Sequence, residues 1–371
     1  MLNYNHVAET LKCLISLKKC MVDDLLLPVY SVDGDNYEIG YQIGKKFKTQ
    51  IADVLGKNKR LKSLKESEKK NSRLQKLVEY GKRCFSRYMQ EIRGVAEGSG
   101  SSLTDILLRN FYYDYPREGC TTVIFKESDR IILAHNEDNS KDNLNNCYLL
   151  KIHPEDGTPF ISLCYAGMIP GNSLAFNVYG IVISNDAMLT PDIRIGCPRH
   201  LAHRWGLEAK NMRDAIERVL FKERASGGSI NIASQKGKKA VNIETTSLKH
   251  CITEIGDRHL HANHHISPEL GYLKEDIPIL KSSISRQAVG DRLLSKVREK
   301  TPQAALDIMS SLENTPYSIL RTDERVGSIT LFTALFDVDY YRGVTLKVYE
   351  PKPNMRVEDA FLELTLDDLK N

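Results

Sequence analysis

The chain has 371 residues, of which 41% are hydrophobic and 27% charged, and its formal net charge is only +4. This ordinary globular composition allows one large or two modest domains, and it gives no general case for binding nucleic acid or a membrane. Eight cysteines lie scattered without a CxxC pair, which favours reduced thiols and a cytoplasmic location. No apolar run reaches the roughly 18 residues of a membrane span, and the N-terminal "LKCLISLKKC" is too lysine-broken for a signal peptide.

The first third of the chain predicts helices. Apolar residues recur at every fourth position, at Ile39, Ile43, Phe47, Ile51 and Leu55. A second helical stretch covers residues 71–100 and ends in a glycine-rich segment. Residues 45–83 are strongly basic, which indicates either a solvated helical hairpin or a docking surface for an anionic ligand such as a phosphorylated acyl carrier.

Strands dominate after Cys120. Residues 120–126 and 130–136 flank the polar turn "ESD", residues 147–166 predict a second hairpin around "PEDG", and a third strand pair turns at Tyr179-Gly180. Helices are expected at Ala202–Glu223 and Pro302–Leu312, the second with Thr301 as its N-cap. Strands return at 229–246 and 327–351. This interleaving predicts an α+β fold of stacked helical and sheet layers.

The dipeptide Gly119-Cys120 opens the first of these strands. If the bond between them is cut, Cys120 carries both a thiol and an α-amine with an unperturbed pKa of about 7.7–8.0. That amine can take the proton of its own thiol, and the thiolate is the competent nucleophile. The alternative interpretation is that Cys120 is a structural cysteine, buried in a strand after a turn glycine.

Six short motifs in order distinguish these interpretations. They are "GYQIG" at 40–44, "EIRGVAEG" at 91–98, "GCTT" at 119–122, "HNED" at 135–138, "HANH" at 261–264 and "YSILR" at 317–321 followed by "GSITLF". With them the chain resembles the isopenicillin N acyltransferase (acyl-coenzyme A:6-aminopenicillanic acid acyltransferase) family of N-terminal nucleophile (Ntn) hydrolases, from about Gly40 to the C-terminal strands. The resemblance implies a four-layer αββα sandwich with a helical N-terminal segment.

The resemblance also implies roles for individual residues. Cys120 matches the nucleophile, which autoproteolysis after Gly119 exposes. Asp138 matches the acid that orients the new amine, Asn263 a side chain of the oxyanion hole, and Arg321 a catalytic-site arginine. Two residues apart on a strand, Asn136 and Asp138 share one face, so both are expected to look toward Cys120.

Thr122, Asn136 and Asn185 are predicted substrate contacts, although ordinary strand positions also explain Thr122 and Asn185. Each catalytic assignment also has an alternative, purely structural explanation. Asp138 and Asn263 suit turns, and Arg321 could pair with a neighbouring carboxylate. Four histidines, His259, His261, His264 and His265, could ligate a transition metal. The family pattern uses the intervening asparagine and no metal, so no metal is expected.

We therefore expect an autoprocessing cysteine Ntn amidohydrolase or acyltransferase that forms an acyl-Cys120 intermediate. Processing would give a small helical chain, residues 1–119, and a large αββα chain, residues 120–371, which stay associated. Glu137 and Asn139 stand where the penicillin enzymes carry aromatics, which favours a small polar amide or thioester. No cofactor is expected, with acyl-CoA as a possible acyl donor.

Two other functions stay open. One is a non-processing binding protein on the same fold. The other is a Cys–His hydrolase that uses His261, His264 or His265 as its base.

Overall fold

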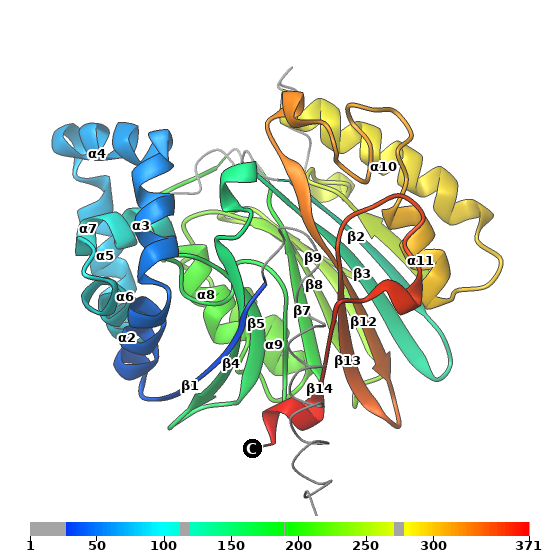
Figure 1. Ribbon diagram of the computed structural model, residues 1–371, viewed down its shortest axis with the longest axis horizontal. Helices are drawn as coiled ribbons and strands as arrows, with labels where there is room; N and C mark the ends of the chain where they lie inside the picture. Colours follow the sequence, from blue (N-terminus) through cyan, green and yellow to red (C-terminus); the bar gives the residue numbers. More distant parts are fainter. Residues whose placement is uncertain (1–26, 112–118, 189, 191, 271–277, 371) are drawn as a thin grey trace, which may run out of the picture.

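The computed structural model describes residues 27–111, 119–188, 190, 192–270 and 278–370. Two sheets lie face to face between helical layers (Figure 1). The eight-stranded sheet runs in the order β1 (Val29–Gly34), β4 (Cys147–Pro154), β5 (Phe160–Tyr165), β6 (Ala175–Asn177), β7 (Ile181–Asp186), β8 (Gly228–Ser234), β9 (Lys239–Thr245) and β10 (His250–Glu254). The six-stranded sheet runs β11 (Arg258–His261), β2 (Gly119–Lys126), β3 (Arg130–Asn139), β12 (Ile329–Asp339), β13 (Gly343–Tyr349) and β14 (Leu362–Thr365).

Helices cover the outer face of each sheet (Figure 1). On the eight-stranded sheet lie α2 (Asn36–Lys46), α3 (Lys48–Lys57), α4 (Lys59–Asn71), α5 (Arg73–Cys84), α6 (Ser86–Ser99), α7 (Leu103–Phe111), α8 (Arg199–Gly206) and α9 (Met212–Val219). On the six-stranded sheet lie α10 (Pro278–Lys296) and α11 (Pro302–Met309). Among the described residues, no helix combines the length and apolar character needed to cross a membrane.

Three hydrophobic clusters correspond to the three interfaces between layers. One joins α2–α9 to the eight-stranded sheet, one fills the space between the sheets, and one lies under α10 and α11. Three stacked interfaces require four layers, so the predicted α+β, αββα sandwich is confirmed.

Local sequence explains several boundaries. Helix α2 begins with a capping box in which Asp35 and Glu38 bind each other's backbone N–H groups. Thr301 caps α11 and Pro302 follows it, as predicted. The three predicted strand pairs are also present.

The glycines of the first two motifs serve helix packing. A Cβ on Gly40 would lie 2.0 Å from the Glu91 carbonyl oxygen, and one on Gly94 would lie 2.2 Å from the Tyr37 oxygen. Helices α2 and α6 can approach so closely only because these positions lack side chains.

The structure differs from the prediction at one helix and adds one strand to the N-terminal segment. The helix expected over Ala202–Glu223 is divided into α8 and α9, and Asn211 caps the second. The N-terminal segment is not wholly helical either, because β1 pairs in parallel with β4 in the eight-stranded sheet. The segment therefore contributes a strand as well as helices.

Candidate active site

The candidate nucleophile lies at the start of β2, beside β3. Gly119 is opposite Asp138, and Cys120 is opposite Glu137. Side chains alternate along a strand, and on β2 Ile124 belongs to the inter-sheet core, whereas Val123 and Phe125 belong to the core under α10 and α11. Cys120 therefore points between the sheets, whereas Asp138 points toward the α10 and α11 layer.

Asn136 shares its face of β3 with Asp138, as predicted, but this face is opposite to the Cys120 side chain. Its Nδ2 donates to the carbonyls of Met309 and Ile319, each at 3.0 Å. Its Oδ1 accepts from Thr333 at 2.7 Å. The expectation that Asn136 looks toward Cys120 is wrong, since its hydrogen bonds tie the sheet to the α11 region.

The Cys120 thiol is buried, with 3% of the residue exposed. Burial raises the pKa of this thiol well above its usual value, and the nearby Glu137 and Asp186 carboxylates raise it further. In the uncut chain the thiol is therefore neutral. It needs a base before it can act as a nucleophile.

A cavity of about 90 Å³ lies beside Cys120. Its wall includes the polar residues Glu137, Asn139, Tyr165, Asn185 and Asp186. Asn185 Nδ2 donates to Ser173 O at 2.7 Å, whereas its buried Oδ1 has no hydrogen-bond partner in the described structure. The structure thus brings Asn185 and Cys120 to one cavity, whose lining combines these polar groups with apolar side chains such as Leu108 and Met168.

Asn263 binds the backbone nitrogen of Cys120. Its Oδ1 accepts from Cys120 N at 3.0 Å and from Arg286 Nη2 at 2.6 Å, while its Nδ2 donates to Ala187 O at 2.7 Å. An amide nitrogen carries two hydrogens, so Nδ2 keeps one for a second acceptor. Asn263 thus holds the Cys120 nitrogen and retains a donor for an oxyanion.

Sequence reasoning missed Arg286, on α10. This fully buried guanidinium donates to the Cys120 carbonyl at 2.5 Å and to Thr121 Oγ1 at 2.7 Å, in addition to Asn263. Burial lowers the pKa of Arg286 to about 10, which leaves it cationic at neutral pH. Arg286 therefore places a positive charge directly at the Gly119-Cys120 segment.

Gly119 is surrounded by polar atoms from distant parts of the chain. A Cβ at this position would lie 2.9 Å from Asn263 Oδ1, 3.0 Å from Arg286 Nη2 and 3.0 Å from Arg321 Nη1. Arg321 is thus at the predicted site. It is not paired with Asp323, whose carboxylate binds Arg325. A side chain at 119 would displace these three polar groups from the backbone, a reason for glycine that the sequence did not show.

Asp138 is a buried carboxylate with one unused oxygen. Its Oδ1 accepts from Thr330 Oγ1 at 2.7 Å, and its Oδ2 has no partner among the described residues. Burial raises the pKa of Asp138 to about 6, although Arg321 and Arg286 oppose the shift. A buried acceptor without a donor costs free energy. The Oδ2 atom of Asp138 is therefore available to accept a further hydrogen bond.

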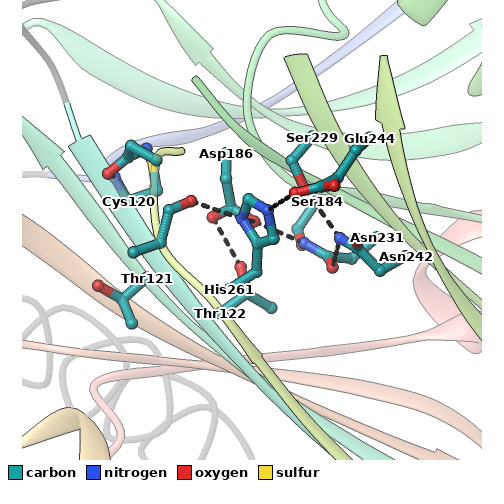
Figure 2. Close-up of polar contacts among 12 residues, drawn as sticks. Cys120, Thr121, Thr122, Ser184, Asp186, Ser229, Asn231, Asn242, Glu244 and His261 are labelled. Carbon is teal, nitrogen blue, oxygen red and sulfur yellow. Dashed lines mark hydrogen bonds and ion pairs between the residues drawn. The ribbon is translucent and has the colours of Figure 1, made fainter. Parts of the chain in front are cut away.

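A hydrogen-bonded group, which we call the polar layer, fills one end of the space between the sheets (Figure 2). It comprises Thr122, His135, Glu137, Ser184, Asp186, Ser229, Asn231, Asn242, Glu244 and His261.

Thr122 belongs to this layer and is not among the residues that line the cavity. Its Oγ1 donates to Asp186 at 2.9 Å and lies 2.9 Å from His135 Nδ1. His135 Nε2 lies 3.1 Å from Glu137 Oε2. Burial lowers the pKa of His135, but the Glu137 carboxylate outweighs it and raises the pKa overall. Thr122 therefore lies within a buried chain of hydrogen-bonded polar side chains and not on the cavity wall. Its position does not support the predicted contact with substrate.

Three of the four predicted histidines each have a different partner. His261 binds Glu244, His264 binds Ser283, and His265 lies 3.4 Å from the Thr245 carbonyl. In the described ranges, the group with converging metal-ligand atoms is instead Cys120, His135 and Glu137, within 4.8 Å of one another. Since His135 is already bound to Glu137 and Thr122, this trio is better explained as the contact between Cys120 and the polar layer.

Comparisons with known proteins match this chain to one acyltransferase family and to two enzymes, a hydrolase and an acyltransferase. The family model described as acyl-coenzyme A:6-aminopenicillanic acid acyl-transferase matches residues 125–353. The chain is 30% identical over 221 residues, 52% of its length, to a β-alanyl-dopamine/carcinine hydrolase of Drosophila melanogaster, and spans only 57% of that protein. It is 27% identical over 318 residues to the 40 kDa form of acyl-coenzyme A:6-aminopenicillanic-acid-acyltransferase of Emericella nidulans, covering 82% of this chain and 88% of the relative.

Among solved structures, a mutant of the conjugated bile acid hydrolase from Clostridium perfringens superposes with a TM-score of 0.41 at 9% identity. The match covers 66% of this chain and 96% of that one.

Proposed function

Since the chain belongs to the acyl-coenzyme A:6-aminopenicillanic acid acyl-transferase family, we propose that it is an autoprocessing cysteine Ntn enzyme. It cleaves or transfers the acyl group of a small amide or thioester through an acyl-Cys120 intermediate. Its relatives are enzymes that act on amide bonds. The observation that carries the proposal is the convergence of Asn263, Arg286 and Arg321 on the peptide between Gly119 and Cys120.

Processing begins when Cys120 Sγ attacks the carbonyl carbon of Gly119. The C–N bond breaks, the nitrogen of Cys120 takes the thiol proton, and a thioester joins Gly119 to Sγ. Water then hydrolyses this thioester to a Gly119 carboxylate and a free thiol. The cationic Arg286 and Arg321 stabilise the negative charge that develops on the attacked carbonyl.

After the cut, the nitrogen of Cys120 is an α-amine with more hydrogens to donate. Asn263 Oδ1 already accepts from this nitrogen at 3.0 Å. The unused Oδ2 of Asp138, opposite Gly119 in the β2–β3 pair, is an acceptor for the new hydrogens. The amine then serves as the base that the buried thiol lacks.

In turnover, Cys120 Sγ attacks the substrate carbonyl and the α-amine passes the thiol proton to the leaving group. The second hydrogen of Asn263 Nδ2 binds the oxyanion. Water or another amine resolves the acyl-enzyme. The small chain stays in place because β1 is hydrogen-bonded to β4, and α2–α7 share a core with the eight-stranded sheet.

The polar cavity wall favours an acyl group of small size and polar character, such as the β-alanyl group in the name of the Drosophila relative. Acyl-CoA is a possible donor by analogy with the Emericella relative, and the mechanism uses no cofactor. The six described cysteines are free thiols, which favours a reducing, cytoplasmic location.

The test is the intact mass of purified protein. Wild type should give two chains divided between Gly119 and Cys120, and Cys120→Ala should give one. Cleavage of the alanine variant at the same bond would assign the cut to another protease and remove the proposal.

One observation bears on the Cys–His alternative. The histidine whose ring nitrogen lies within 4.8 Å of the Cys120 sulfur is His135, and neither His261, His264 nor His265 lines the cavity. Both ring nitrogens of His135 are engaged, with Glu137 and Thr122. An enzyme assembled from residues 1–119 and an Ala-Cys120 chain distinguishes the two bases, because its amine has become an amide. Near-complete loss of turnover with a native circular dichroism spectrum is expected.

A further inference from the structure

The loop of residues 262–267 carries Asn263 to the Cys120 nitrogen. Helix α10 holds one side of this loop, because Asn263 N donates to Ser283 Oγ at 2.6 Å and Ala262 N donates to Gln287 Oε1 at 3.1 Å. The other side is held by a buried pair of charged groups from β9 and β11. The mechanism above gives that pair no role.

Glu244, on β9, gathers four donors. It accepts from His261 Nε2 at 2.9 Å, from the backbone nitrogens of Ile266 at 2.7 Å and Ser267 at 2.9 Å, and from Ser267 Oγ. Only 2% of the residue is exposed. Burial raises the pKa of Glu244, but these hydrogen bonds outweigh it and lower the pKa to about 2. Glu244 is thus an anion whose acceptor sites are all directed at the far end of the loop and at His261.

His261, on β11, binds the near end of the same loop. Its Nδ1 lies 2.6 Å from the carbonyl of Ala262, the residue before Asn263, and 3.7 Å from Asp186 Oδ2. With acceptors at both ring nitrogens, His261 is a doubly protonated imidazolium. Burial lowers its pKa, but the bond to Glu244 and the charge of Asp186 raise it overall.

Asp186 brings the pair back to the active site. The residue after it is Ala187, whose carbonyl accepts from Asn263 Nδ2. The loop is therefore fixed at its start by His261, at its end by Glu244, and at the Asn263 amide itself by the segment after Asp186. Figure 2 shows His261 between Glu244 and Asp186, with Cys120 at the nearby end of β2.

We propose that Glu244 and His261 are positioning residues for the reaction, which fix loop 262–267 so that the Asn263 amide stays on the Cys120 nitrogen and keeps its second hydrogen for the oxyanion. This rests on the proposed function, because it assigns Asn263 a part in catalysis. A buried ion pair adds little net stability compared with apolar residues. A positional requirement explains why one is present here.

The experiment compares Glu244→Gln with Asn263→Ala and the double variant, all in processed enzyme. Glutamine retains the size but turns one acceptor into a donor against existing donors. Glu244→Gln should lower kcat about 10- to 100-fold and leave KM within about threefold, because the loss concerns an interaction made in the transition state. In the Asn263→Ala background the same substitution should change kcat by less than about twofold, since Glu244 acts through Asn263. Additive losses would overturn the proposal.

The matched control is Asn242→Ala, on the same strand and two residues away. Asn242 donates to Ser229 Oγ at 2.8 Å and Asn231 Oδ1 at 2.9 Å, and among the described residues its hydrogen bonds go to β8 and not to loop 262–267. It should leave kcat within about threefold, whatever it costs in thermal stability. An equal loss of kcat in the control would reduce Glu244 to a structural residue.

Should Glu244→Gln fail to fold, Ser267→Ala removes only the hydroxyl donor to Glu244. It should lower kcat several-fold, and an unchanged kcat would count against the proposal. Failure of the proposed function is separate, because wild type would then show neither the cut before Cys120 nor turnover of any acyl amide.

Discussion

The space between the two sheets has two ends of opposite chemistry, built from the same strands. On β7 the inward residue is Val182 at one end and Asp186 at the other, and on β9 it is Ala240 at one end and Glu244 at the other. All four side chains are buried to a similar degree. Burial alone therefore does not distinguish the two ends, although the sequence changes from apolar to charged within a few residues.

The difference shows which end stabilises the fold and which serves chemistry. Apolar surface removed from water contributes about 25 cal/mol per Å², whereas buried charges must first lose their hydration. Cys120 and its cavity lie at the polar end. The apolar end thus contributes stabilising free energy to folding. That contribution offsets the cost of burying charged groups in fixed positions at the polar end.

The largest expected effect is a loss of turnover on substitution of Asn263, which tests the assignment of chemistry to the polar end. Asn263→Ala should lower kcat roughly 10²- to 10³-fold, because it removes an oxyanion donor. Steady-state kinetics of processed enzyme, supported by thermal unfolding, measures it. Asn136→Ala is the matched control, a buried asparagine whose partners are Met309, Ile319 and Thr333. Similar kinetic losses in both variants would mean that Asn263 is only structural.

At the apolar end, Leu133→Ala should cost about 3 kcal/mol of unfolding free energy, through lost burial and a residual cavity. Leu133 is fully buried in the inter-sheet core. The folded enzyme should keep its kcat within about twofold, since Leu133 is opposite Ile124, four positions along β2 from Cys120. Denaturant unfolding and kinetics together check this. A large loss of kcat with normal stability would contradict the assignment of stability to the apolar end and of chemistry to the polar end.

The third prediction concerns pH and the uncut Cys120→Ala protein. The pKa of Asp138 is about 6 in the folded chain because of burial, against about 3.9 when unfolded. The folded state binds this proton more tightly, so the stabilisation is complete below pH 4 and is lost as pH rises to about 6. The loss is on the order of 3 kcal/mol. Adding Asp138→Asn should remove it from unfolding curves at pH 4 to 7, and identical curves would contradict the raised pKa.

The smallest effect is expected where two polar groups leave together. Asn231 and Asn242 bind each other through Asn242 Nδ2 and Asn231 Oδ1 at 2.9 Å. Replacing both by leucine, of similar size, removes their mutual hydrogen bond without leaving either amide unpaired, but it also takes donors from Asp186 and Ser229. The double variant should therefore cost about 1–3 kcal/mol of unfolding free energy, less than the sum of the two single substitutions. A loss in the double variant that equals or exceeds that sum would contradict the coupling between the two asparagines.

Much of the fold was predictable because local signals are strong at turns and caps. The hairpin around "ESD", the Thr301 cap and the layered α+β class are all present. Strand β1 escaped notice, since its parallel partner β4 lies more than a hundred residues away and a single short strand has little periodicity of its own.

The site was less predictable, for two physical reasons. Motif resemblance found Cys120, Asp138, Asn263 and Arg321, which the structure brings together around Gly119. Arg286 lies within a helix whose sequence gives no sign that its side chain turns inward.

The polar layer was missed for another reason. Alternating strands such as residues 229–231 and 242–244 conventionally indicate a solvent-facing side. Alternation does not reveal that a second sheet covers that side.

The crowding around Gly119 has a consequence for biosynthesis. Its three neighbours, Asn263, Arg286 and Arg321, are translated long after Gly119 itself. A nascent chain that still lacks Arg321 does not have the complete set of groups that act on the bond. If the chain is processed as proposed, the cut waits until the segment that carries Arg321 has been translated and has folded beside Gly119. The proposed cut would then act as a checkpoint, because a chain truncated before Arg321 would stay uncut and inactive.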